Sequence, residues 1–181
     1  MMGIRIVCLG LVLMAGTAWG ERGPQDHWVV EDDLTFDTWG GSYEEDLAYG
    51  DGKLYLSGSD RGCTAPFDFI QVYSTDGELL GTIAEDQLSG SVYGVAYFDE
   101  KLYMADTEAG QVQVYTINDT FVTNWGTQGS AEGQFDNIQG IAVDSNYVYT
   151  VETGTDRLQV FDHTGQFIRS WGGAWECCRP V

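Results

Sequence analysis

The sequence has 181 residues, of which 43% are hydrophobic and 13% are aromatic, so we expect one domain with an apolar core and exclude a disordered chain. It carries 8 basic and 28 acidic residues, which gives a formal net charge of −20. That charge excludes nucleic acid as a partner, because the phosphates would be repelled. The acidic side chains predict a solvated surface, suited to high salt or to collecting cations.

The first twenty residues have the pattern of a secretory signal peptide. MMGIRIVCLGLVLMAGTAWG combines one positive charge, an apolar run and small residues at Ala18 and Gly20, which predicts cleavage after Gly20. The run is too short for a membrane span and no second one follows, so we expect a soluble protein that is secreted, periplasmic or extracellular. Residues 21–33 are expected to form an N-terminal arm.

From residue 34 to residue 173 the chain contains three repeats, each with four short segments rich in β-branched and aromatic residues. The first segments are DLAYG (46–50), GVAYF (94–98) and GIAVD (140–144), and the second are KLYLSG (53–58), KLYMAD (101–106) and YVYTVE (147–152). The third are FIQVYS (69–74), QVQVYT (111–116) and RLQVFD (157–162), and the fourth are ELLGTI (78–83), FVTNWG (121–126) and QFIRSWG (166–172). Glycine and aspartate lie between the segments, as in STDG (74–77) and DHTG (162–165), where tight turns are expected.

Four-stranded antiparallel units at this period are typical of propeller blades, because such a sheet buries its faces only against its neighbours. We therefore predict an all-β fold, a β-propeller of four-stranded blades with three blades present, at about 34–83, 84–126 and 127–173. Residues 174–181 leave the repeat pattern and are expected to form a tail. The stretch WGTQGSAEGQF (125–135) should cross from one blade to the next through turns with positive φ, fixed by Gln134 and by the ring of Phe135 between the blades.

The third repeat resembles an NHL repeat over its full length, through WGTQGSAEGQF, GIAVD, VYTVETGTDRLQVFD and GQFIRSWG. The second repeat is similar to a lesser degree and the first least, because it contains the insertion RGCTAPFD at 61–68. The NHL pattern has an acid at the end of the second strand and an arginine at the start of the third. The resemblance implies that Asp106, Glu152 and Arg157 are structural residues that pair blade to blade.

Three blades do not complete a propeller, which has four to eight. TWGGSYE at 38–44 recurs as SWGGAWE at 170–176, so the sequence stops at the beginning of a further blade. Two explanations remain: the chain is part of a longer propeller, or two copies form a homodimer with a six-bladed ring. We favour the first, because the expected strand at 34–40 has no blade to complete and the tail abandons the repeat.

Few residues suit catalysis or metal binding. After cleavage the chain keeps His27 and His163, too few for a site of three histidines, and His163 is expected in an exposed turn. Calcium is the ion that fits the acids best, with Glu44, Glu45 and Asp46 as candidate ligands, although no EF-hand spacing occurs.

The remaining cysteines are Cys63, Cys177 and Cys178, which leave open a disulfide from Cys63 to one of the pair. The sequence indicates no catalytic residue and no required cofactor. We expect an exported NHL-type propeller module that acts as a binding scaffold for a protein or a glycan. The alternative is a fragment of a metal-dependent propeller lyase or hydrolase.

Overall fold

The computed structural model describes residues 42–60, 69–85, 87–88 and 91–173. All of them belong to the second of two compact units, Thr38–Val181. The expected signal peptide at 1–20, the arm at 21–33, the strand at 34–40, the insertion at 61–68 and the tail at 174–181 lie outside the described residues. The predictions for His27 and for the three cysteines lie outside them as well.

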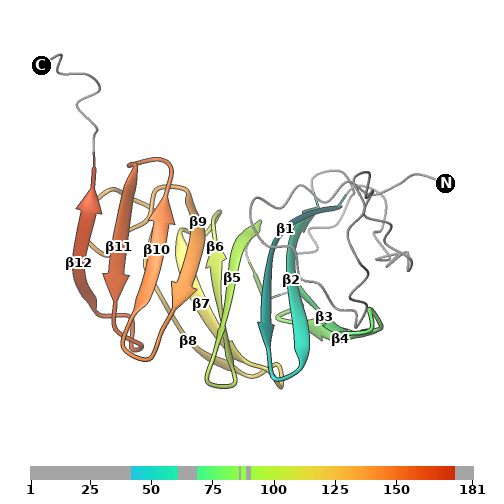
Figure 1. The fold of residues 1–181 in the computed structure, drawn as a ribbon. Coiled ribbons are helices and arrows are strands. Elements are labelled where there is room, and N and C mark those ends of the chain that lie inside the picture. The colour runs from blue at the N-terminus through green and yellow to red at the C-terminus, as the bar shows by residue number, and fades with distance from the viewer. Residues whose placement is uncertain (1–41, 61–68, 86, 89–90, 174–181) are drawn as a thin grey trace, which may run out of the picture. The chain divides into compact units, whose positions relative to one another are not determined.

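The described residues form strands and turns, and the strands make three separate four-stranded antiparallel sheets (Figure 1). The first sheet contains β1 (Ser42–Gly50), β2 (Lys53–Asp60), β3 (Ile70–Ser74) and β4 (Leu79–Ile83). The second contains β5 (Val92–Phe98), β6 (Lys101–Asp106), β7 (Gln111–Thr116) and β8 (Phe121–Trp125). The third contains β9 (Ile138–Val143), β10 (Val148–Glu152), β11 (Arg157–Phe161) and β12 (Phe167–Gly172).

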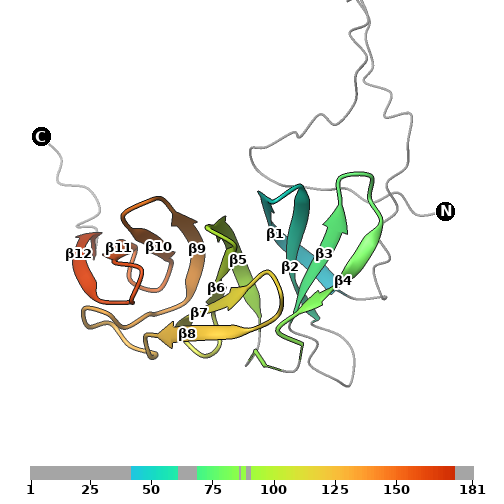
Figure 2. The ribbon, with the colours of Figure 1, turned by 90° about the horizontal axis from the view of Figure 1, so that it is seen from below.

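In each sheet the strands follow in chain order, and the first strands β1, β5 and β9 are neighbours from sheet to sheet (Figure 2). This arrangement confirms the prediction of an all-β fold with three propeller blades. We call the sheets the first, second and third blade. The described part of the chain holds no helix long and apolar enough to cross a membrane.

The tight turns between the third and fourth strands form where the sequence predicts them. In the first blade, the Gly77 amide donates to the Ser74 carbonyl over 3.1 Å, and in the third the Gly165 amide donates to the Asp162 carbonyl over 3.0 Å. Both glycines have positive φ, 84° and 86°, a region that glycine enters without steric cost. These turns confirm the interpretation of STDG and DHTG.

The alternation of side chains along the strands gives every blade two faces. We call forward face the one that carries Tyr55 opposite Val72, Tyr103 opposite Val114, and Tyr149 opposite Val160, and back face the other. The forward face of the first blade packs on the back face of the second, which carries Leu102, Met104 and Tyr115. The second and third blades repeat this contact, so two apolar cores lie between three blades.

Candidate functional site

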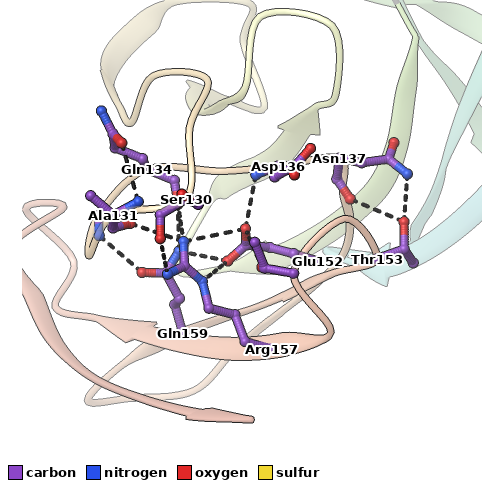
Figure 3. A network of polar contacts seen from close by, with 11 residues as sticks. Ser130, Ala131, Gln134, Asp136, Asn137, Glu152, Thr153, Arg157 and Gln159 are labelled. Atoms are coloured by element: carbon purple, nitrogen blue, oxygen red, sulfur yellow. Dashed lines mark hydrogen bonds and ion pairs between the residues drawn. The ribbon is translucent and has the colours of Figure 1, made fainter. Parts of the chain in front are cut away.

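A buried ion pair lies at one end of the third blade. Glu152 ends β10 and Arg157 begins β11, and the two residues are directly opposite in the ladder. Arg157 Nε donates to Glu152 Oε1 over 2.7 Å, and the two side chains are 9% and 0% exposed (Figure 3). A carboxylate buried so completely requires partners for both of its oxygens.

The ion pair binds the segment that connects the second blade to the third, residues 126–137. Arg157 Nη1 donates to the Ser130 carbonyl, and Nη2 donates to the carbonyls of Ala131 and Gln134, over 2.7 to 2.9 Å. In return, Glu152 Oε2 accepts the amide of Asp136 over 2.8 Å. The planar guanidinium suits this task, because its donors reach several carbonyls at once. Figure 3 shows the connecting segment beside these two side chains.

Gln159 completes the network. It lies two residues after Arg157 on β11, so its side chain is on the same face of the sheet. Its Nε2 donates to Glu152 Oε1 and to the Gln134 carbonyl, each over 2.7 Å, and its Oε1 accepts the Gly133 amide over 2.9 Å. The side chain is fully buried. Sequence reasoning missed this residue, although a glutamine in the middle of an apolar strand segment was the available signal. The network satisfies its buried groups within the blade and its own connection.

The connecting segment also fixes an aromatic ring between two blades. Phe135 is fully buried among residues of the second and third blades, as the sequence predicted. Gly126 has a φ of 95°, and a Cβ there would lie 2.4 Å from the Phe135 ring. Gly129 and Gly133 also have positive φ. The glycines of WGTQGSAEGQF therefore serve the path of the chain, as expected.

The second blade has a smaller version of the network. Asp106 accepts Gln113 Nε2 over 2.7 Å and the Ala109 amide over 3.1 Å. Gln111 occupies the position of Arg157 and accepts Asn124 Nδ2 instead. The link to the next blade comes from Thr107, whose hydroxyl donates to the Ile138 carbonyl over 2.6 Å.

The carboxylate of the calcium candidate Asp46 binds backbone amides through both of its oxygens. Asp46 Oδ2 accepts the Val95 amide of the neighbouring blade over 3.1 Å, and Oδ1 accepts the Leu47 amide over 2.9 Å. Burial raises the pKa of the Asp46 carboxyl, although these two donors act in the opposite direction. Glu45 is half-buried, and the side chain of Glu44 lies outside the described residues. Within the described ranges, no three His, Cys, Asp or Glu side chains are grouped so as to hold a metal ion.

His163 lies between two blades, and the expectation of an exposed turn residue is corrected here. It is half-buried, and its Nδ1 lies 2.9 Å from the hydroxyl of Tyr103 in the second blade. Its ring centroid is 5.3 Å from that of Phe98. The turn is placed where predicted, but it packs against the preceding blade, which the local sequence does not reveal.

The likeness of this chain to known proteins lies in its fold. No protein-family model matches the sequence, and no curated protein sequence matches it. Among solved structures, glutaminyl cyclase from Myxococcus xanthus is similar with a TM-score of 0.55 and 18% identity, over 75% of this chain and 55% of that one. A chain of a nidogen/laminin complex has a TM-score of 0.57 and 19% identity, over 73% of this chain and 48% of that one.

A computationally designed protein, Ika4, is similar with a TM-score of 0.56 and 20% identity, over 78% of this chain and 80% of that one. At these identities the likeness concerns the fold alone. The described blades span about half the length of the cyclase chain and of the nidogen/laminin chain. The described part of the chain is thus a β-propeller module of three blades.

Proposed function

We propose that this chain is an exported propeller module of the NHL type that binds a protein partner. The binding surface would be the end of the third blade that carries the connecting segment, with residues 127–137 and 153–156. We call it the loop end. The observation that supports this choice is the network of Glu152, Arg157 and Gln159, whose hydrogen bonds fix the backbone of an exposed loop.

A loop held in this way suits binding for an energetic reason. Three backbone carbonyls of the segment are fixed by one buried guanidinium, so the loop loses little conformational freedom when a partner binds. The side chains of Glu132 and Asp136 are exposed at the loop end. The partner is therefore expected to present basic groups, which would speed association and fix its orientation. The fold shared with a chain of a nidogen/laminin complex is consistent with protein binding.

A panel of purified secreted proteins, with laminin included, tests the proposal by biolayer interferometry. A partner that binds the wild type should bind the double variant Glu132→Lys, Asp136→Lys at least about tenfold more weakly, because two rim charges are reversed. The matched control is Asp99→Lys, Glu100→Lys, which reverses two exposed charges in the β5–β6 turn at the opposite end of a blade. Equal losses in both variants would contradict a site at the loop end.

An enzymatic function is the alternative, and the fold shared with a glutaminyl cyclase supports testing it. A metal-dependent lyase or hydrolase should keep a divalent ion after dialysis. Mass spectrometry of the metal content, on the dialysed protein, separates the two functions. A stoichiometric ion would favour the enzyme, and a binding module needs none.

A further inference from the structure

The forward face of the third blade has no blade against it among the described residues. It carries apolar side chains and one cation, Arg169, whose guanidinium lies 4.9 Å from the centroid of the Trp171 ring. Val151 and Trp171 lie on it and are 46% and 51% exposed. In the second blade the equivalent position to Val151 in the ladder is Ala105, which is fully buried in the contact with the third blade. The third blade thus presents the same side of the repeat that the first two blades bury.

The back face of the first blade shows the complementary exposure. Leu47 and Tyr49 are 37% and 57% exposed there. Their ladder equivalents in the second blade are Val95, which is 3% exposed, and Tyr97, which stacks on Tyr55 of the first blade with ring centroids 5.9 Å apart. The two ends of the three-blade array therefore carry the two halves of a contact that occurs twice inside the chain.

The side chains at the end of the fourth strands indicate which blade fits. Trp125 ends β8, and its ring packs on the turn of the third blade, where a Cβ on Gly165 would lie 2.6 Å from the ring. Ile83 ends β4, and the facing turn of the second blade has Asp119 in place of the glycine, bound through Oδ1 to the Ala84 amide over 2.8 Å. A tryptophan thus faces a glycine turn, and a smaller isoleucine faces a turn without glycine.

Trp171 occupies the same place on the forward face of the third blade. By analogy with Trp125, the turn that faces the Trp171 ring should contain a glycine. The β3–β4 turn of the first blade has one, Gly77, and its φ of 84° is close to the 86° of Gly165. The pattern therefore selects the back face of a first blade as the surface that fits Trp171.

Of the two explanations that the sequence leaves open, these faces favour the second: we propose that the forward face of the third blade binds the back face of the first blade of a second copy of this chain. The contact is head-to-tail, and each copy contributes three blades. Two copies give six blades, which lies within the four to eight of closed propellers, so the ring closes after two subunits.

Light scattering after size exclusion tests this arrangement, with Val151→Asp as the central variant. A carboxylate in the middle of an apolar contact should raise the dissociation constant of the dimer about thirtyfold or more. The matched control is Val122→Asp, because Val122 is a valine of similar exposure, 43%, on the outer strand β8 of the second blade, at an irregularity of the ladder where it has no partner residue. Far-UV circular dichroism verifies that both variants keep the fold.

A second variant, Tyr49→Asp, tests the opposite side of the same contact. In a head-to-tail ring either substitution alone alters both contacts, and each variant should be monomeric. When the two variants are mixed, one contact carries both substitutions and the other carries none. Native mass spectrometry should then detect a mixed dimer held by the intact contact. A wild-type monomer at all concentrations, a Val151→Asp dimer as stable as the control, or no mixed dimer would each overturn the proposal.

Discussion

At the scale of residues, several buried or half-buried polar side chains of the described blades bind backbone atoms outside their own strand. Arg157 binds three carbonyls, Glu152 binds an amide of the connecting segment, and Asp46 binds an amide of the neighbouring blade. Side chains that replace backbone partners in this way hold irregular segments in place where no ladder is available.

Removal of Arg157 should be the most damaging change in the network. Arg157→Met leaves Glu152 buried without its cation and leaves three carbonyls without a donor, so we expect a loss of about 3–5 kcal/mol in the free energy of unfolding. The double variant Glu152→Gln, Arg157→Met should lose less free energy of unfolding than the two single variants lose when added together, because both residues belong to one network. Urea denaturation measures these losses. A single-variant loss below about 1 kcal/mol would indicate a pair with the energetics of a surface salt bridge.

Two tyrosines at equivalent ladder positions allow a matched comparison. The Tyr103 hydroxyl bonds to His163 over 2.9 Å, whereas the Tyr55 hydroxyl is buried and has no hydrogen-bond partner among the described residues. Burial also raises the pKa of Tyr55 to about 12. Tyr103→Phe should therefore destabilise the protein by about 1 kcal/mol, and Tyr55→Phe should be neutral or stabilising. Thermal unfolding of both variants checks the order, and equal losses would argue against it.

Asp162 predicts a dependence of stability on acid. Its carboxylate accepts hydrogen bonds from the Thr164 hydroxyl and from amides of the same turn. These donors, the hydroxyl above all, lower the pKa of Asp162 below its ordinary value. A lowered pKa in the folded state gives stability that is present above the ordinary aspartate range and is lost as the pH falls through the folded pKa. Between neutral and acid pH, the free energy of unfolding of Asp162→Asn should therefore fall by less than that of the wild type. Identical curves would show that the turn does not contribute.

At the scale of elements, the connecting segment 126–137 is as important to the fold as a strand. It carries Phe135 into the core between two blades and turns through glycines with positive φ. This segment and the apolar core beside it place the third blade on the second, since the two sheets share no ladder within the described residues.

A pair of glycine variants separates conformational strain from crowding in this segment. Gly52 and Gly126 both have positive φ, but a Cβ at Gly52 meets nothing within 4 Å, whereas one at Gly126 meets the Phe135 ring. Gly52→Ala should cost about 1 kcal/mol for the backbone alone. Gly126→Ala should cost about 1–3 kcal/mol more, because the core must also rearrange. Chemical denaturation of both variants gives the difference, and equal costs would mean that the ring moves freely.

The sequence predicted the elements well because their signals are local. Alternating apolar residues and glycine turns define the strands, and the repeats define their grouping, so the blades and the burial of Phe135 were predictable. Three contacts were not predictable from the sequence: the packing of His163 against the neighbouring blade, the hydrogen bonds of Gln159, and the bond from the Val95 amide to Asp46. These contacts depend on which loop of a neighbouring blade lies opposite, and no periodicity within one repeat contains that information.

At the scale of the whole molecule, the net charge of −20 opposes both folding and self-association. Between about 0.01 and 1 M salt the screening length falls from about 30 Å to about 3 Å. We therefore expect added NaCl to raise the melting temperature and to shift light-scattering masses toward that of the proposed dimer. A mass that falls with salt would indicate that charge pairs, rather than the apolar blade faces, hold the copies together.

The separation of the three sheets has a mechanical consequence. Within the described chain the blades are joined by apolar faces, by one connecting segment at each junction, and by single bonds such as Thr107 to Ile138. A pulling force along the chain would load these junctions one after another, because no continuous ladder distributes the force across blades. In single-molecule stretching the module should extend in steps of one blade, and the junction held by the Arg157 network should resist longest.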